Sequence, residues 1–318
     1  MSNKKRKFAL LFRFLVSFGV LAWLLIARTS LGDVWRTLLT AAPLWLALSF
    51  SLHTLGLLIS AVRWRILIRA QGDDADLGFL MRSYLAGTFF NIFLPSRIGG
   101  DLVRIWDGSR VSRTVTRSSA IVLVERLTGV VMLLLFALGA SLLRIDMARR
   151  LPVIWVALIT AAAGLAVLLS ALLPAAGRLL ARGPERGLAG RLKAKIIEVR
   201  ETILDYRNAP RALALAFFWA FLLQINVVIH FYLIGKALGL AIGPLDYFIF
   251  IPIVLLIQLI PVTINGLGLR EGAYTEIFGF YGIGASSALA FSMIDLAFMI
   301  LVGLAGMIIY FTRRRSPQ

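Results

Sequence analysis

Two stretches of the 318-residue sequence combine residue types that could bind a charged ligand. Residues 91–110 read NIFLPSRIGGDLVRIWDGSR, and residues 257–274 read IQLIPVTINGLGLREGAY. In both, an apolar segment stops at a proline, passes through glycines and then presents arginine with an acid. Proline ends a helix and keeps its predecessor out of the α conformation, while glycine permits close approach of the backbone. We therefore predict a broken helix at each stretch.

Broken helices at membrane depth are suited to binding an anion. Their unpaired N–H and C=O groups are tolerated when they are buried in protein or line a watery cavity. Helix N-termini attract anions, and a guanidinium binds phosphate as a fork. We expect an anionic lipid headgroup to be bound by the following residues of the two stretches: Asn91, Pro95, Arg97, Gly99, Gly100, Asp101, Arg104, Pro261, Asn265, Gly266, Gly268, Arg270 and Glu271.

The charged residues of these stretches also have a purely structural interpretation. Arg97 with Asp101, and Arg270 with Glu271, could neutralise each other and only fix the two hairpins. Adjacent side chains point in different directions, so Arg270 and Glu271 need not form a pair. A role in binding and a role as a lock can both hold.

Three further candidate substrate-binding residues, Glu125, Arg126 and Asp295, lie within apolar segments. A charge near the bilayer centre costs roughly 2.5–3.5 kcal/mol on insertion scales, so such residues usually face the protein interior. Glu125 could bind a proton or pair with Arg97 or Arg104. Arg126 could snorkel to the cytoplasmic interface. Asp295 could carry a coupled proton or pair with the arginine of the second stretch.

The remaining residue types argue against an enzyme or a metal protein. The sequence has no cysteine, which excludes disulfides, thiolate catalysis and cysteine metal sites. His53 and His230 are far apart in the sequence and have no other metal-ligating residues near them in it. We therefore interpret them as packing or interface residues. We find no nucleotide-binding, hydrolase or metalloprotease motif, and we expect no cofactor. A membrane enzyme that uses Glu125 or Asp295 is the weakest hypothesis.

The composition is that of a polytopic membrane protein. Hydrophobic residues make up 59% of the chain and charged residues 16%, with a mean hydropathy of +0.86. Soluble domains are about 45–50% apolar and about 25% charged. The net charge of +18 is explained by the positive-inside bias and by anionic lipids, so we expect no nucleic-acid partner. The start resembles a signal peptide, but its long apolar run and the lack of a small-x-small cleavage site predict an uncleaved first span.

Apolar runs predict six transmembrane helices, at about 8–27, 42–62, 118–143, 151–173, 211–234 and 285–311. Two shorter apolar segments, 79–95 and 246–262, end at Pro95 and Pro261. Clusters of Lys and Arg place both termini in the cytoplasm of a cell (inner) membrane protein. The same rule is satisfied if each shorter segment enters and leaves on one side. We therefore predict an all-α fold of six full spans and two opposed re-entrant broken-helix hairpins.

The two halves of the single membrane domain, 1–318, show an inverted repeat in their pattern. Triplets of small residues precede and follow the two prolines in the same order, and each second triplet is followed by an acid, Glu125 or Asp295. We predict half-repeats at 8–143 and 151–311, inserted with opposite topology. Opposed broken segments in inverted halves are typical of secondary transporters.

A basic segment at 174–210 is predicted to be a cytoplasmic amphipathic linker. Within 186–206, apolar residues recur at steps of three and four among largely basic positions. This pattern indicates a helix that lies in the interface of an anionic membrane. A solvated linker helix is the alternative.

Three ordered motifs resemble a known family. NIFLPSRIGGDLVR, VLVERLTGVV at 122–131 and IPVTINGLGLREGAY resemble the signature blocks of the lysylphosphatidylglycerol synthase transmembrane-region family, also called flippase-like or UPF0104 proteins. The resemblance covers nearly the whole chain and implies a polytopic domain associated with moving lipids between leaflets. By motif it carries over to Asn91, Pro95, Arg97, Gly99, Gly100, Asp101, Arg104, Glu125, Arg126, Pro261, Gly266, Gly268, Arg270 and Glu271.

The sequence departs from this family in two ways. Many relatives have proline-glycine where this chain has Ile264 and Asn265, so the second hairpin could turn differently. Only a short tail follows Phe311, where true synthases carry an aminoacyl-transferase domain, so we do not expect lysyl transfer.

The leading hypothesis is a lipid translocator for an anionic or modified (glyco)phospholipid or an isoprenoid-type lipid. Its partners would be membrane lipids with anionic headgroups. The alternative is a membrane scaffold that does not transport and that docks a cytoplasmic lipid-modifying transferase on its basic face.

The opposed hairpins predict a labelling pattern that can be measured directly, because the chain has no cysteine. Single cysteines at Ser96 and Asn265 should react with an impermeant maleimide from opposite sides, Ser96 from the cytoplasm and Asn265 from outside. Intact cells and inverted vesicles provide the two sides. Labelling of both positions from one side would contradict the inverted repeat.

Overall fold

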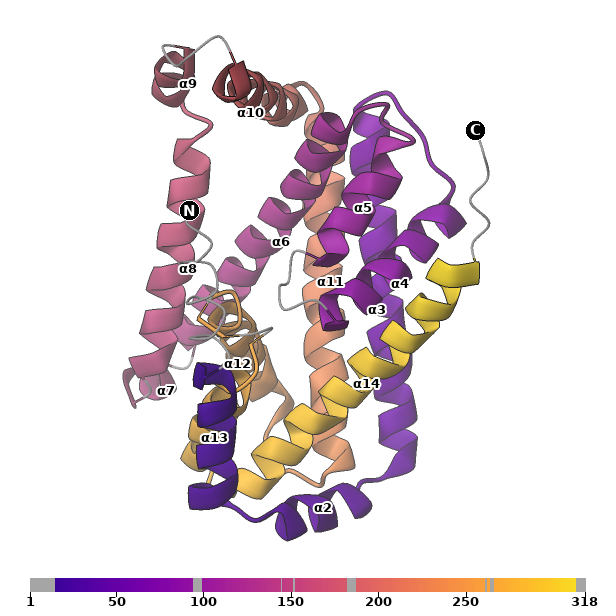
Figure 1. Cartoon of the computed structure of the whole chain (residues 1–318). Coiled ribbons are helices and arrows are strands. Elements are labelled where there is room, and N and C mark those ends of the chain that lie inside the picture. The colour runs from indigo at the N-terminus through magenta and orange to yellow at the C-terminus, as the bar shows by residue number, and fades with distance from the viewer. Residues whose placement is uncertain are drawn as a thin grey trace.

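The structure is a computed structural model that describes residues 15–93, 99–143, 145–150, 152–181, 187–260, 262–263 and 266–312. In these residues every regular element is a helix (Figure 1). The chain is therefore all-helical, as its composition predicts. Six residues singled out from the sequence lie outside the described part: Pro95, Ser96, Arg97, Pro261, Ile264 and Asn265.

Four helices are long and apolar enough to cross a membrane, namely α3 (Pro43–Ala70), α6 (Val115–Leu143), α11 (Pro210–Ala237) and α14 (Ala285–Thr312). Each has 28 or 29 residues, about 42 Å of helix against a hydrocarbon core of about 30 Å. A fifth span results if the bent pair Leu15–Arg28 and α2 (Leu31–Leu39), which meet at 87°, is counted as one. The described residues thus support a multi-pass membrane protein with four or five spans. Six spans and an inverted repeat remain predictions.

The helices α3 and α11 form the central pair of the bundle. Ser49 lies against His230, and the Leu52 carbonyl accepts a hydrogen bond from Asn226 at 3.0 Å. Residue numbers rise along α3 as they fall along α11, so the two helices are antiparallel. Among the exposed side chains of the four long helices are many leucines, isoleucines and phenylalanines, as expected of surfaces in contact with lipid.

The first stretch lies on α4 (Leu77–Phe93) and α5 (Gly99–Ser109), which pack against each other (Figure 1); α5 also packs against α6, and α4 against α14 and α3. A side chain at Gly100 would collide with the Gly87 carbonyl and with Asn91, so glycine lets α5 approach α4 closely. This approach brings the charged residues of α5 to the inner side of the bundle, where Asp101 and Arg104 are buried.

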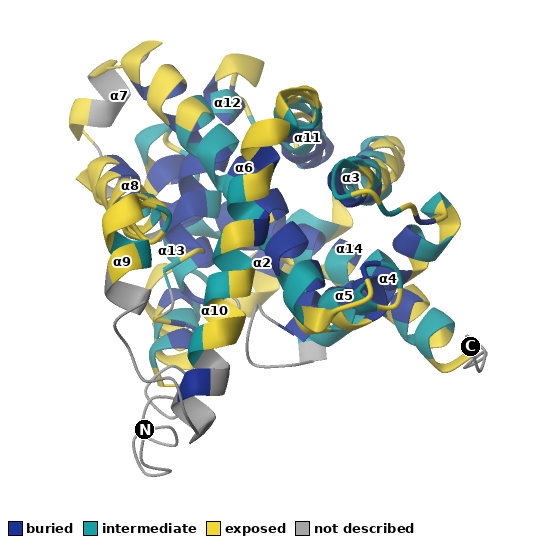
Figure 2. Cartoon of the chain, turned by 90° about the horizontal axis from the view of Figure 1, so that it is seen from above, coloured by how far each residue is buried: buried dark blue, intermediate teal, exposed yellow. Residues whose placement is uncertain are grey.

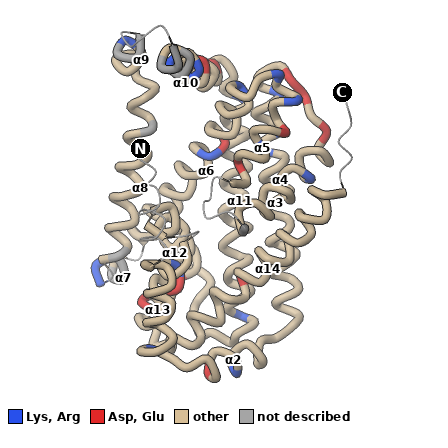
Figure 3. Tube along the Cα trace, viewed as in Figure 1, with Lys and Arg blue, Asp and Glu red and all other residues tan. Residues whose placement is uncertain are grey.

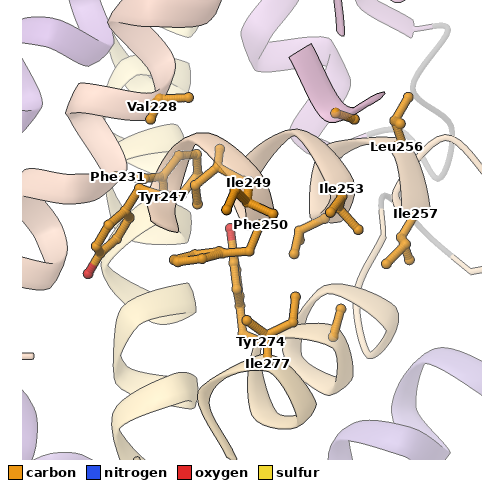
Figure 4. Close-up of a cluster of buried hydrophobic side chains, with 14 of the residues drawn as sticks. Val228, Phe231, Tyr247, Ile249, Phe250, Ile253, Leu256, Ile257, Tyr274 and Ile277 are labelled. Atoms are coloured by element: carbon orange, nitrogen blue, oxygen red, sulfur yellow. The ribbon is translucent and has the colours of Figure 1, made fainter. Parts of the chain in front are cut away.

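The second stretch lies between α12 (Pro244–Ile257) and α13 (Leu269–Phe280). Gly266 and Gly268 have φ angles of +83° and +84°, in the left-handed region that favours glycine. The buried core is centred here, because α12 is surrounded by α6, α8 (Pro152–Ser170), α11 and α13. Figure 4 shows its side chains converging, with Phe250 above Tyr274, and Figure 2 shows the buried residues gathered between these helices.

Short helices lie at the two ends of the bundle. The predicted amphipathic segment is largely helical: α10 (Gly187–Asp205) is followed by a 3₁₀ turn in which Tyr206 is buried and donates to the Leu67 carbonyl at 2.8 Å. It lies beside α9 (Pro174–Ala181) at the upper end in Figure 1. At the opposite end α2 exposes Leu31, Trp35 and Leu39, the kind of face that lies in a membrane interface.

The crossing of α14 and α4 predicts a sharp difference between two glycines. A Cβ at Gly306 would overlap the main-chain carbonyl of Leu85, so Gly306→Ala should force the helices apart and destabilise the protein by about 1–3 kcal/mol. A Cβ at Gly139 in α6 would meet no neighbouring side chain or helix within 4 Å, so Gly139→Ala is the matched control and should be neutral or slightly stabilising. Denaturant unfolding in detergent measures both. Equal stability of the two variants would contradict the close crossing.

Candidate functional site

Two clusters of largely buried charged residues lie in the bundle. Figure 3 shows charged residues in both its upper and its lower half. The first charge cluster consists of Arg63, Asp101, Arg104, Glu125 and Arg126. The second consists of Arg270, Glu271 and Asp295. Both contain acids and arginines that the sequence singled out. The first draws on α3, α5 and α6, and the second on the consecutive helices α13 and α14.

Glu125 is the centre of the first charge cluster. Its side chain is 3% exposed, and its Oε1 atom accepts a hydrogen bond from Arg63 Nη2 at 3.0 Å. Tyr84 donates its hydroxyl to the same oxygen, and Arg104 Nη2 donates to Oε2. One carboxylate therefore ties α3, α4 and α5 to α6.

Arg104 is held in place by aromatic rings as well as by Glu125. Its guanidinium carbon lies 3.9 Å from the centroid of the Tyr84 ring and 4.6 Å from that of Trp64. Trp64 and Tyr84 meet edge to face, with their centroids 5.7 Å apart. Cation–π contacts of a desolvated guanidinium contribute on the order of 2 kcal/mol. The geometry fixes the plane of Arg104 and thus the directions of its N–H groups.

The positive charges of the first cluster exceed its negative charges. Asp101 accepts from Arg126 Nε, and its other oxygen lies 3.6 Å from Arg104 Nη1. Three guanidinium groups and two carboxylates give a net charge of +1 for the five residues. The Arg126 side chain is 44% exposed, so the cluster extends from the interior to the surface of α6.

Several N–H groups of this cluster have no acceptor among the described residues. They are Nε and Nη1 of Arg63 and Nε of Arg104, all buried. A buried donor without an acceptor costs about 1–3 kcal/mol, and more when it is charged. An anionic oxygen that entered the cluster would relieve this cost. The first charge cluster is therefore a candidate anion site.

The second charge cluster is more completely paired. Arg270 donates from Nε and Nη2 to Glu271 Oε1, at 3.0 and 2.8 Å, and from Nη1 to Asp295 Oδ2 at 3.0 Å. Ser292 donates to the same Glu271 oxygen at 2.6 Å. One guanidinium and two carboxylates give these residues a net charge of −1. The pairing of Arg270 with Glu271, which the structural interpretation requires, is thus observed.

The backbone at the start of each short helix is capped by the chain itself. The Gly100 N–H donates to Asn91 Oδ1 at 2.7 Å, and the Gly268 N–H donates to Glu271 Oε2 at 2.7 Å. These two amides are therefore not available to a ligand in this structure, although the sequence suggested free helix N-termini. Asn91 and Glu271 position α5 and α13.

A loop outside the spans fixes the end of α3 relative to α4 and α6. Asp74 accepts from Arg69 at 2.9 and 3.0 Å and from Arg65 at 3.2 Å, and the hydrogen bond from Arg69 holds the pKa of Asp74 well below its ordinary value. Arg117 at the start of α6 reaches the Gln71 carbonyl and Asp73. These contacts hold α3 in the register that brings Arg63 to Glu125.

The sequence indicates most of the charged residues of the two clusters but not two of their partners. Glu125 pairs with Arg104, as one alternative predicts, and Asp295 pairs with Arg270. In the sequence, Arg63 marks only the cytoplasmic end of a span predicted to stop at residue 62. The helix α3 continues to Ala70, which places Arg63 inside it. Tyr84 has no sequence signal that distinguishes it from an interfacial tyrosine.

Comparisons with known proteins agree with these motifs. The family described as "Lysylphosphatidylglycerol synthase TM region" matches residues 10–306. A UPF0104 membrane protein of Methanothermobacter thermautotrophicus is 24% identical over 310 residues, which cover 90% of this chain and 88% of that protein. A second one from the same organism is 25% identical over 283 residues, 83% of each chain. A UPF0104 membrane protein of Pyrococcus horikoshii is 23% identical over 293 residues, 85% of this chain and 88% of its own.

The bridging role of Glu125 predicts a large loss of stability on its removal. Glu125→Ala leaves the buried guanidinium groups of Arg63 and Arg104 without their acid, which should cost about 3–5 kcal/mol of unfolding free energy. Glu276→Ala removes an acid 63% exposed and 3.9 Å from Arg28, and should cost less than about 1 kcal/mol. Urea unfolding in detergent compares them. Similar losses for the two variants would show that Glu125 does not bridge the helices.

Proposed function

Because the chain belongs to the lysylphosphatidylglycerol synthase TM region family, we propose that it moves a lipid with an anionic headgroup between the leaflets of the membrane. The substrate class is an anionic or modified (glyco)phospholipid or an isoprenoid-type lipid phosphate. The observation that carries the proposal is the first charge cluster: the buried guanidinium groups of Arg63 and Arg104 have N–H groups that lack an acceptor among the described residues, and partly exposed Arg126 gives the cluster its net positive charge.

The position of the first charge cluster suits a headgroup in transit. Glu125 lies ten residues after Val115, the first residue of α6, which is about 15 Å along the helix axis. Because α6 has 29 residues, about 43 Å, and the hydrocarbon core is about 30 Å thick, a centred helix would place Glu125 about a third of the way into the core, where a phosphate needs a protein partner. Arg126 would receive the headgroup at the surface, and Arg104 and Arg63 would bind it inside. The acyl chains would stay in the bilayer beside the exposed apolar faces.

An inverted repeat is part of the proposal and has support from the second charge cluster. Asp295 lies ten residues after Ala285, as Glu125 does after Val115. The start of α6 contacts the end of α3 through Arg117 and Gln71, whereas the start of α14 packs on α2, which precedes α3. Glu125 and Asp295 therefore lie equally far from the starts of their helices, and these starts lie near opposite ends of α3. We infer six spans, with α4–α5 and α12–α13 as the two opposed broken hairpins.

The repeat implies alternating use of the two hairpins, with both termini in the cytoplasm of a cell membrane protein. The basic residues around α9 and α10 would then face anionic lipid on the cytoplasmic side. The same basic face is the feature that a scaffold for a lipid-modifying transferase would use. Lipid movement by the purified chain separates these two functions.

The proposal predicts headgroup-selective lipid movement in reconstituted vesicles. Fluorescent phosphatidylglycerol in the inner leaflet should become accessible to dithionite faster with protein than without it, and faster than fluorescent phosphatidylcholine. Arg104→Gln should lower the rate of phosphatidylglycerol movement by about tenfold or more, because it removes charge-assisted hydrogen bonds of about 1.5–3 kcal/mol. Arg126→Gln, at a side chain 44% exposed, is the second variant and should act in the same direction without unfolding the protein.

Arg36→Gln is the matched control, because that side chain is 85% exposed on α2 and lies 4.0 Å from Asp33, at the limit of an ion pair. It should leave the rate unchanged. Equal rates in vesicles with folded protein and in protein-free vesicles would refute translocation. The scaffold would then be the better hypothesis, and neutral substitutions of exposed basic residues on α10, such as Lys195, would test it.

A further inference from the structure

Three residues outside the first charge cluster meet in the lower half of the bundle. His53 on α3, His230 on α11 and Asp295 on α14 each offer one ligand atom, and these atoms all lie within 4.8 Å of one another. The two imidazole rings are 5.1 Å apart between centroids. The expectation that the two histidines have no other metal-ligating residue near them is therefore wrong. The antiparallel packing of α3 and α11 brings together residues that are distant in sequence.

The hydrogen bonds of His230 prepare one of its nitrogens to bind a cation. Its Nδ1 lies 3.0 Å from the Ser49 carbonyl and 2.8 Å from the Ser49 hydroxyl, which itself donates to the His230 carbonyl. Both Ser49 oxygens are thus acceptors toward Nδ1, so Nδ1 carries the proton of the neutral ring. The lone pair is left on Nε2. A hydrogen bond of this kind orients most metal-bound histidines.

The free Nε2 of His230 points at another acceptor. It lies 3.5 Å from Asp295 Oδ1, and it has no hydrogen-bond partner among the described residues although the side chain is only 4% exposed. Two lone pairs at this distance repel each other unless a positive charge lies between them. The spacing is close to the roughly 3.3 Å that separates two ligands in a tetrahedral site with bonds of about 2.0–2.1 Å.

Asp295, like His230, has one atom held by a hydrogen bond and another that is left for an ion. The local charge also favours a cation. Its Oδ2 accepts from Arg270 at 3.0 Å, which leaves Oδ1 for an ion. With neutral histidines, Arg270, Glu271 and Asp295 sum to −1 in a buried setting. An uncompensated buried charge is costly. A bound cation would compensate it.

We propose that His53, His230 and Asp295 form a binding site for a late divalent transition-metal ion such as Zn²⁺. Two imidazoles and one carboxylate suit zinc, whereas magnesium and calcium prefer ligand sets made of oxygen only. The ligand atoms must approach by about 1–1.5 Å to reach zinc spacing, which side-chain rotation can supply. Partly exposed His53 leaves a fourth position for a water or an anionic oxygen. The ion would fasten α3, α11 and α14 together at one depth.

The site is tested by metal binding to the purified full-length chain, which is independent of lipid movement. The protein is prepared in detergent without a histidine tag, stripped with EDTA and dialysed against micromolar ZnCl₂, and its zinc is measured by mass spectrometry. We expect about one Zn²⁺ per chain. His53→Ala and His230→Ala should weaken binding at least about tenfold, and Asp295→Asn should weaken it in the same direction.

Glu276→Gln is the matched control, because it neutralises an acid of α13 that is 63% exposed and is not one of the three proposed ligands. It should keep the zinc. Absence of stoichiometric zinc from the unaltered chain would overturn the proposal, and a proton on His230 would then supply the missing charge. Loss of zinc from Glu276→Gln as well would also overturn it, since binding would then not depend on the three proposed ligands.

A second measurement places the ion at His53 even if the alanine variants unfold. The chain has no cysteine, so His53→Cys introduces a single thiolate. Addition of Co²⁺ to this variant should produce a sulfur-to-metal charge-transfer band that the unaltered chain lacks. A band requires a Co–S bond and would support the site, whereas Co²⁺ binding without the band would exclude His53 as a ligand.

Discussion

The carboxylate of Glu125 is the contact on which the packing of α3, α4, α5 and α6 depends. A helix bundle in lipid gains little from the hydrophobic effect between its helices, so polar contacts and close packing must hold it together. Glu125 accepts from Arg63, Tyr84 and Arg104, which come from three helices. Each of these polar groups would be costly alone in hydrocarbon, and each becomes tolerable only when the others arrive. The helices α3, α4, α5 and α6 are therefore coupled by charge.

Both charge clusters join helices through ion pairs, but their net charges have opposite signs. The first has one positive charge in excess and buried N–H groups without acceptors among the described residues, whereas the second has one negative charge in excess and a lone pair on His230 that faces an acid. A fold that only required locks would be expected to balance each cluster. These unpaired groups are the basis of the two proposals, an anion at the first charge cluster and a cation beside the second.

The sequence predicts the helices far better than it predicts their partners. Long apolar runs locate α3, α6, α11 and α14 to within a few residues at most ends, because the span length is set by the bilayer and not by other parts of the chain. The predicted end of α3 is residue 62 instead of Ala70, since arginines normally mark the membrane boundary. An arginine can lie inside a span when an acid from another helix meets it, and Arg63 does so. Which residue becomes the partner depends on how the helices pack. Neither the role of Tyr84 nor the contact between His53 and His230 could therefore be predicted from the sequence alone.

The extent of hydrogen bonding separates the structural residues of the two motifs from those suited to a ligand. Asn91 and Glu271 both cap helix starts within their own stretch, and Arg270 uses all three guanidinium nitrogens on two acids. These groups have few hydrogen-bonding atoms left for a ligand. Their presence is explained by the need to stabilise a broken helix in a membrane. Arg104 is different, because its ring contacts fix its plane while leaving Nε without an acceptor among the described residues. A rigid, desolvated and incompletely bonded guanidinium is what phosphate recognition requires, so we assign the proposed function of this chain to Arg104 and a stabilising role to Arg270.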